Sequence, residues 1–544
     1  MRRLKVRGVG FIMTLALFLF VLPVHAQEIE TSMIKYGRLM QLIENYYVDT
    51  ANIDRLTENA VVEVLGKLDP HSVYISKDEV EEMNEPLEGN FEGIGISFNI
   101  LRDTLRVVTT IPGGPSEKAG LMPGDRIVVI DGKPVAGTGL KNKDVMNMLR
   151  GEKGTQVKLK VQRQTGAEPL AFTIVRDKIP IYSLDASYML DDQTGYIKLN
   201  RFSATTTEEF SEAIKKLKKR PEFKNLILDL RGNGGGYLKA AIELADQFLG
   251  PQQLVVYTEG VHEPRKDYKS SALGEFEQGK LVVLIDEGSA SASEIVAGAV
   301  QDWDRGIIVG RRSFGKGLVQ QPFPLTDGSM IRLTTAHYYT PSGRGIQKPY
   351  DKGVDEYRKD YLNRFESGEL FTRDSIHVDK GQSFETLKNK RLVYGGGGVM
   401  PDVFVPMDTS SHYGFFNMLA RQNILYSVSM DYMITNRDKI SNRYKSFQEF
   451  REHFEVPDEV IDKMIAESDK EKIEKDSASV DFARPLILKQ VKALLARDLY
   501  GPDFYYVILN QDEAIIREAL QVLKEPAEYK QLLAERVNNA TGDL

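Results

Sequence analysis

Three serines stand close together in the segment DEGSASASEIVAGAV, where an apolar run gives way to a helical pattern; they are Ser289, Ser291 and Ser293. Ser291 and Glu294 fit the S-x-x-E pattern of a capping box, which would hold the first turn of the following helix. A hydroxyl at a helix N-terminus also lies beside unpaired N–H groups and the positive end of the dipole, which stabilise an oxyanion. The segment therefore predicts a helix cap, a nucleophile, or both, and the spacing does not choose among the serines.

A nucleophilic serine needs a general base, and a lysine is the better candidate. The chain has seven histidines, and the most suggestive, His71 in the turn LDPHS, is typical of a capping or structural residue. Lys316 lies between two glycines in a segment with apolar neighbours. Lowering a lysine pKa from about 10.4 to near 7 takes roughly 4 to 5 kcal/mol, which burial can supply, and the neutral amine then accepts a proton. If residues 316 to 320 are extended, Gln320 shares a face with Lys316 and its amide can orient the amine.

Two glycine-rich segments resemble phosphate-binding loops. GRRSFGKG, residues 310 to 317, fits G-x-x-x-x-G-K-[ST] except that Gly317 replaces the hydroxyl residue. DLRGNGGGY, residues 229 to 237, lacks the G-x-G-x-x-G spacing. Glycines after a strand also expose N–H groups to a substrate carbonyl, so Gly234 and Gly235 are candidate oxyanion donors. Nucleotide binding is the weaker interpretation of both segments.

The N-terminus predicts export. MRRLKVRGVGFIMTLALFLFVLPVHAQ has a basic start, an apolar run and a small residue at Ala26, as in a signal peptide spanning residues 1 to 26. The run is short for an uncleaved membrane anchor. Removing its four basic residues leaves 67 Lys and Arg against 78 Asp and Glu, so the remaining chain has no basic footprint for nucleic acid. The absence of cysteine excludes disulfides, thiolate catalysis and cysteine-ligated metals.

The pattern of strands and helices that must position these residues predicts a multidomain α/β fold. Strands at residues 195 to 202, 225 to 231 and 280 to 287 alternate with helical patterns, which indicates a partly parallel sheet. A hairpin is expected around Asp327 and Gly328. The predicted regions after the signal peptide are a helical segment at 27–88, a β-rich domain with short helices at 89–175, an α/β core at 176–408 and a mainly helical module at 409–544. The charged stretch 351–392 carries no readable signal.

Seven segments, in order between about residues 35 and 405, resemble the carboxyl-terminal processing peptidases, also called tail-specific proteases. They are LDPHS, GIGI with GLMPGDRI, LDLRGNGGG, SASASEI, SFGKGLVQ, DGSMIRLTTAHYYTPSGRGIQ and GGGVMPD. The resemblance implies a crotonase-like protease core and a serine endopeptidase that acts by acyl transfer. It implies Ser291 as nucleophile, Lys316 as general base and Gln320 as its positioning partner. The backbone N–H groups of Ala292 and Gly235 would be the oxyanion donors.

The same resemblance implies that residues 89–175 form a PDZ domain. Its peptide-binding residues would be Gly93, Ile94, Gly95 and Ile96, whose N–H groups face a chain-terminal carboxylate beside an apolar pocket and an open strand edge. Taken alone, GIGI is equally consistent with a glycine-rich strand end. The expected partners are proteins or peptides with accessible, apolar C-termini. A homo-oligomer or an adaptor is a further expected partner that the sequence leaves open.

The hypothesis from sequence is therefore a periplasmic or envelope serine endopeptidase that captures C-terminal tails. We expect it to need no metal, nucleotide or other cofactor. The alternative from another class is a non-catalytic PDZ scaffold or chaperone-like binder, in which Ser291 caps a helix and Lys316 is a strand charge.

Overall fold

The computed structural model describes residues 24–101, 103–163, 168–272, 274–377, 380–408 and 413–534. They fall into two compact units, one ending at Tyr74 and one beginning at Ile75. The first contains α2 Val24–Tyr46 and α3 Ile53–Gly66, in the region where helices are predicted. Most of the predicted signal peptide lies outside the described residues. Within the described ranges, no helix is long and apolar enough to cross a membrane.

The second unit begins with a β-rich domain that two short paired strands enclose. After α4 Lys77–Glu88, strand β2 Asn90–Gly93 pairs antiparallel with β9 Asp177–Pro180. Between them lies a sheet of order β3-β4-β5-β7-β8, with β6 paired to β5. Its elements are β3 Ile96–Leu101, β4 Thr104–Thr110, α5 Pro115–Lys118, β5 Arg126–Ile130, β6 Lys133–Pro134, α6 Asn142–Leu149, β7 Gln156–Gln162 and β8 Leu170–Val175. Alternate side chains of these strands, such as Leu105 and Val107, pack with Val145 and Leu149 of α6 into one core.

A second, six-stranded sheet of order β10-β11-β12-β15-β16-β21 forms the α/β core. Its strands are β10 Leu184–Met189, β11 Thr194–Leu199, β12 Asn225–Asp229, β15 Lys280–Ile285, β16 Ile307–Gly310 and β21 Val403–Phe404. β10 is antiparallel to β11, and the other neighbours pair in parallel. The crossover helices are α7 Thr206–Leu217, α8 Leu238–Asp246 and α9 Ala292–Asp302. The predicted, partly parallel α/β sheet is confirmed.

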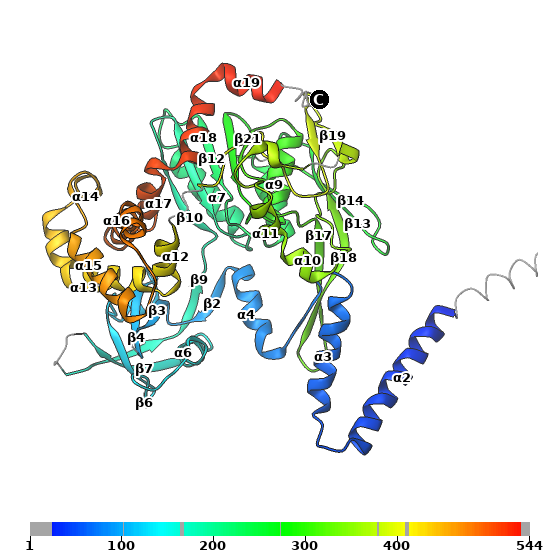
Figure 1. The fold of residues 1–544 in the computed structure, drawn as a ribbon, viewed down its shortest axis with the longest axis horizontal. Helices are drawn as coiled ribbons and strands as arrows, with labels where there is room; N and C mark the ends of the chain where they lie inside the picture. The colour runs from blue at the N-terminus through cyan, green and yellow to red at the C-terminus, as the bar shows by residue number, and fades with distance from the viewer. Residues whose placement is uncertain are drawn as a thin grey trace, which may run out of the picture. The chain divides into compact units, whose positions relative to one another are not determined.

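Helices cover both faces of this sheet, which explains why its strands read as continuous apolar runs. Leu281 and Val283 of β15 face the core shared with α7, α8 and α9. Val282 and Leu284 face α18 Ala514–Lys524 and α19 Pro526–Ala534 on the other side. α18 and α19 therefore complete the core of this sheet, and Figure 1 shows α18 beside β12 and β21.

A smaller sheet lies beside the core and contains the predicted hairpin. β17 Leu318–Pro324 and β18 Met330–Tyr339 pair antiparallel around the turn at Asp327 and Gly328. β18 also pairs with β13 Leu254–Glu259, which pairs with β14 Lys266–Lys269. The following stretch contains α10 Val354–Arg358, α11 Asp360–Glu366, β19 Ser383–Glu385 and β20 Leu392–Tyr394.

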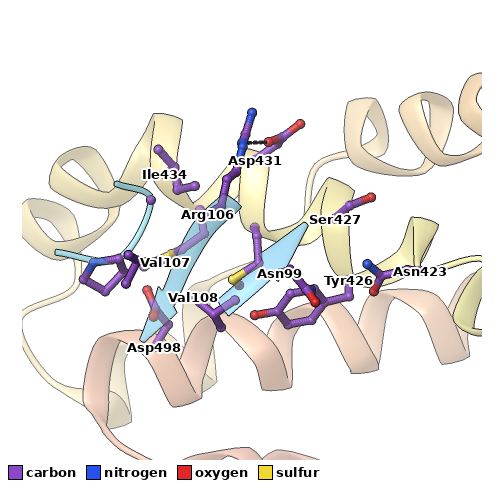
Figure 2. Close-up of a pocket in the computed structure, with 14 residues that line it drawn as sticks. Asn99, Arg106, Val107, Val108, Asn423, Tyr426, Ser427, Asp431, Ile434 and Asp498 are labelled. Atoms are coloured by element: carbon purple, nitrogen blue, oxygen red, sulfur yellow. Dashed lines mark hydrogen bonds and ion pairs between the residues drawn. The ribbon is translucent and has the colours of Figure 1, made fainter. Parts of the chain in front are cut away.

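The remaining helices form a module that packs against the β-rich domain. They are α12 Tyr413–Arg421, α13 Ile424–Arg443, α14 Phe447–His453, α15 Asp458–Lys470, α16 Ser477–Tyr500 and α17 Asp503–Leu509. Arg106 of β4 lies 2.7 Å from Asp431 of α13, and a Cβ at Gly124 would lie only 2.9 Å from Ile434 Cγ1. Figure 2 shows the Arg106–Asp431 pair and Ile434 around a small apolar cavity between the β3–β4 strands and α13. The module thus covers the sheet face opposite the domain's own core.

Candidate active site

The three predicted catalytic segments follow three neighbouring strands of the α/β sheet. The glycine loop follows β12, Ser291 follows β15, and Lys316 follows β16. These strands pair in parallel, β12 with β15 and β15 with β16. Because the carboxyl ends of parallel strands meet at one edge of a sheet, the topology brings the three loops together. The loops are also bonded to one another: Ala290 N–H donates to the Asn233 carbonyl at 3.0 Å, and Phe314 N–H to the Ser289 carbonyl at 2.9 Å.

The structure separates Ser291 from its two neighbouring serines. Ser289 and Ser293 are fully buried. Their hydroxyls donate to the backbone carbonyls of Leu230 at 2.9 Å and Asn233 at 2.8 Å, respectively. Ser291 is only partly buried and occupies the N-cap of α9. Of the three, Ser291 is therefore the serine that a substrate can reach.

The backbone of Ser291 is strained. Its φ of 52° and ψ of −110° lie in a region that residues with a side chain rarely adopt, at a cost of about 1 to 3 kcal/mol. The Ser291 N–H donates to Glu294 Oε2 at 2.8 Å, so the glutamate half of the predicted capping box is present. A sharp turn of this kind between a strand and a helix exposes a nucleophile at the edge of a sheet.

Glu294 joins the nucleophile to the loop that carries the lysine. Its Oε2 accepts from the N–H of Ser291 and, at 2.9 Å, from the N–H of Lys316. Its Oε1 accepts from the Gly315 N–H at 2.7 Å and from the Ser313 hydroxyl. Burial raises the pKa of the Glu294 carboxyl above its ordinary value, while these hydrogen bonds oppose the rise. The two backbone nitrogens of the predicted dyad therefore lie within 2.9 Å of one buried oxygen.

The loop of Lys316 is held by the charged stretch that carried no sequence signal. The guanidinium of Arg364 in α11 donates to the carbonyls of Arg312 at 3.2 Å, Ser313 at 2.9 Å and Phe314 at 3.3 Å. The Arg364 side chain is only 3% exposed. An arginine that bonds three successive carbonyls fixes the path of an irregular loop. Residues 351–392 thus contribute a brace for the predicted base.

Lys316 itself is partly buried, in an irregular segment between two strands. No helix follows GRRSFGKG, whose chain enters β17 at Leu318, so the segment lacks the helix that a phosphate-binding loop requires. The amide of Gln320 donates to Thr334 Oγ1 on the paired strand at 3.3 Å. Orientation of the lysine amine by Gln320 stays a prediction.

The predicted oxyanion donors both lie beside Ser291. Ala292 is the first residue of α9, so its N–H has no acceptor within the helix. Gly235 has a φ of 98°, and a Cβ there would lie 2.9 Å from the Ser291 Cβ and 3.0 Å from the Ala292 nitrogen. Its N–H donates to Asn233 Oδ1 at 2.9 Å. The geometry suits Ala292 directly, whereas Gly235 would have to exchange a hydrogen bond.

A buried ion cluster anchors the start of the glycine loop. Asp229, the last residue of β12, is fully buried and accepts hydrogen bonds from Arg231 and, at 3.2 Å, from Lys198. Burial alone would raise the pKa of Asp229, but the charges of Arg231 and Lys198 hold it well below its ordinary value. Arg231 also pairs with Glu513 at 3.0 Å, just before α18. The C-terminal helices therefore reach the base of the loop that lies against Ser291.

The predicted peptide-binding residues form the turn between β2 and β3. Gly93 ends β2, Gly95 has a φ of 73°, and Ile96 begins β3. The Ile94 side chain is 2% exposed, and its carbonyl accepts the Ser116 N–H at 3.0 Å. β3 is the edge strand, paired with β4 alone among the described strands. An extended peptide can therefore add to its outer edge.

Within the described ranges, no three His, Asp or Glu residues are grouped so that they could hold a metal ion. The site consists of serine, lysine, buried carboxylate and backbone donors.

Known families match the two parts of the site separately. Peptidase family S41 matches residues 193–356, which contain all three loops. The PDZ domain model matches residues 106–163. A family of unknown function, DUF8443, matches residues 415–501, which include α13 to α16. The chain is a serine peptidase with a PDZ domain.

Curated relatives narrow this class. The chain is 35% identical to "Carboxy-terminal processing protease CtpB" of Bacillus subtilis over 376 residues, which cover 68% of this chain and 76% of the relative. It is 38% identical to "Carboxy-terminal-processing protease" of Bartonella bacilliformis over 317 residues, 58% of this chain and 72% of the relative. Among solved structures, "Photosystem II D1 C-terminal processing protease" is 29% identical, with a TM-score of 0.33 over 57% of this chain and 89% of that one. The chain belongs to the carboxy-terminal processing protease family.

Proposed function

We propose that this protein cleaves other proteins whose C-terminal tails its PDZ domain has captured, using Ser291 and Lys316 as a catalytic dyad. The observation that carries the dyad is the pair of hydrogen bonds from both residues' N–H groups to Glu294 Oε2, at 2.8 and 2.9 Å. The names of the curated relatives support processing at a carboxy terminus. The partial exposure of Ser291, in contrast to the buried Ser289 and Ser293, supports its role as nucleophile.

In the proposed acylation step, neutral Lys316 takes the hydroxyl proton as Ser291 Oγ attacks the scissile carbonyl. The carbonyl electron pair moves to oxygen, and the Ala292 N–H stabilises the resulting oxyanion together with the positive end of α9. The lysine ammonium then gives its proton to the leaving amine as the peptide bond breaks. In deacylation, Lys316 takes a proton from water, the hydroxide attacks the acyl group, and the proton returns to Ser291.

Tail capture is proposed at the outer edge of β3. A substrate tail would extend this edge as an antiparallel strand, with its terminal carboxylate at the turn from Gly93 to Gly95. The apolar side chains of the last tail residues would enter the space between β3 and α6. This supports substrates with accessible, apolar C-termini. A homo-oligomer or an adaptor stays a prediction from sequence.

We also propose export to the periplasm or cell envelope, on the strength of the N-terminal sequence. Fractionation of cells that carry the full-length protein tests this. A product shortened by about 26 residues in the periplasmic fraction is expected, and a full-length cytoplasmic product would contradict it.

Cleavage of a loosely folded protein with an apolar C-terminal tail tests the proposed function. Wild-type protein should produce fragments that mass spectrometry detects, and Ser291→Ala and Lys316→Ala should each abolish them while retaining the wild-type circular dichroism spectrum. Removing the apolar tail should raise KM. Tail binding without cleavage by the wild type would favour the non-catalytic PDZ binder instead.

A further inference from the structure

Tyr338 of β18 contacts both members of the proposed dyad through one atom. Its hydroxyl lies 3.0 Å from the carbonyl oxygen of Ser291 and 2.6 Å from the carbonyl oxygen of Lys316. The side chain is 1% exposed. Burial raises the pKa of the Tyr338 hydroxyl well above its ordinary value, so the hydroxyl remains a hydrogen-bond donor throughout the working pH range.

This contact complements the one made by Glu294. The Glu294 carboxylate accepts from the N–H groups of Ser291 and Lys316, and the Tyr338 hydroxyl reaches their carbonyl groups. Two buried side chains from different elements therefore bond to both residues, Glu294 at their amide nitrogens and Tyr338 at their carbonyl oxygens. The sequence separations are 22 residues for Glu294 to Lys316 and 47 for Tyr338 to Ser291, so no local pattern predicts either contact.

We propose that Tyr338 is a positioning residue, which fixes the separation of Ser291 and Lys316 because its single hydroxyl proton is shared, in a three-centre hydrogen bond, between the carbonyl oxygens of both. The inference rests on the proposed dyad and adds a third residue to it. Tyr338 touches no reacting atom and acts only through the backbone of the two residues.

Local conformation explains why such a contact is needed. Ser291 has the strained φ of 52°, and Lys316 lies in a segment without regular hydrogen bonding. Strained conformations persist only where the surroundings over-determine them. Tyr338 itself is firmly placed, because β18 pairs with both β13 and β17 and the Tyr338 N–H donates to the Gly317 carbonyl at 2.9 Å. This paired strand thereby holds the two residues from a third direction, in addition to Glu294 and Arg364.

The test compares Tyr338→Phe with Tyr339→Phe. Tyr339 is the adjacent residue of β18, and its ring stacks on Tyr257 instead, at 4.8 Å between centroids. We expect Tyr338→Phe to lower kcat for a tail-bearing peptide by about 10- to 100-fold with KM within about 2-fold, because a displacement of up to 1 Å has that effect on positioned groups. Tyr339→Phe should change neither kcat nor KM.

A kcat within about 2-fold of wild type in Tyr338→Phe would overturn the proposal. If this variant folds poorly, p-aminophenylalanine at position 338 gives a second test, because its amino group keeps a donor at the same place. It should retain at least one fifth of the wild-type kcat. Equal losses with phenylalanine and p-aminophenylalanine would show a packing effect and also overturn the proposal.

The experiments distinguish failure of the Tyr338 proposal from failure of the proposed dyad. Full activity in Ser291→Ala or Lys316→Ala would remove the proposed function, whatever Tyr338 does. Loss of activity in both, with a wild-type rate in Tyr338→Phe, would remove only the positioning role.

Discussion

Replacing Gly235 with alanine should lower the rate of cleavage, because the new Cβ would clash with the proposed nucleophile, Ser291. An alanine Cβ at this position would lie 2.9 Å from the Ser291 Cβ, 2.9 Å from the Ala290 carbonyl oxygen and 3.0 Å from the Ala292 nitrogen. Carbon atoms in ordinary contact are about 3.5 to 4.0 Å apart, so the loop or Ser291 must move by roughly 0.5 to 1 Å. A left-handed φ of 98° adds about 1 to 2 kcal/mol of strain for a residue with a side chain.

Both effects act at the reaction centre. A displacement near 1 Å lowers the rate of a positioned reaction by about 100-fold. Overpacking and backbone strain together should lower the free energy of unfolding by about 2 to 5 kcal/mol. Initial rates of peptide cleavage and thermal melting of the same preparation measure the two effects separately.

Gly234→Ala is the matched control, because a Cβ at Gly234 would meet no atom within 4 Å. It should keep kcat within about 3-fold of wild type. The reasoning fails if Gly235→Ala retains wild-type kcat, or if the two variants lose activity equally, because the contact with Ser291 would then not be the cause.

The remaining predictions concern the brace, the anchor and the PDZ contact. Arg364→Met should lower kcat/KM about 10-fold and speed amide hydrogen exchange at residues 312 to 317, because three carbonyls lose their donor; unchanged exchange would contradict the brace. The pKa of Asp229 is lowered in the folded state, so its stabilising contribution is present above its unfolded pKa of about 3.9 and is lost as pH falls below it. The melting temperature should therefore fall between pH 5 and pH 3 less steeply in Asp229→Asn than in wild type, and equal slopes would contradict this. Asp431→Lys should speed hydrogen exchange in β4, because the new lysine faces Arg106 and Lys463 with a like charge. Adding Arg106→Glu should restore part of the protection, and no recovery in the double variant would argue against the Arg106–Asp431 pair.

The sequence predicts the α/β core because its strands are apolar on both faces and alternate with helices. Runs such as KLVVLI leave no solvent-facing positions, which is typical of a covered parallel sheet. It also places Ser291 at a strand-to-helix junction, but the choice of Ser291 came from resemblance alone. The structure supplies the physical reason, since Ser289 and Ser293 are buried and bonded to the backbone of other loops.

Other parts of the site depend on contacts between distant residues. Glu294 has the pattern of a helix cap, and nothing beside it in the sequence indicates that its carboxylate also holds the Lys316 loop. Arg364 lies 51 residues from Ser313, in a charged stretch without apolar periodicity. The hydrogen-bond partners of Glu294 and Arg364 are distant in sequence and meet them only in the folded chain. Only the structure therefore identifies the role of these two residues.

In the C-terminal region, too, the sequence predicts secondary structure but not long-range contacts. A mainly helical, mixed-charge region is predictable there, but a helical pattern does not identify the surface that each helix covers. In the structure, α13 covers the PDZ sheet and α18 covers the protease sheet. One predicted helical region thus serves two partners within the chain.

The central claim is that Lys316 activates Ser291, and covalent labelling tests it most directly. Wild-type protein and Lys316→Ala are treated with a fluorophosphonate at neutral pH, and intact mass and peptide mapping follow the adduct over time. The account predicts a single adduct on Ser291 in the wild type and a rate at least about 100-fold lower in folded Lys316→Ala. Labelling of another serine, or an equal rate in Lys316→Ala, would contradict it.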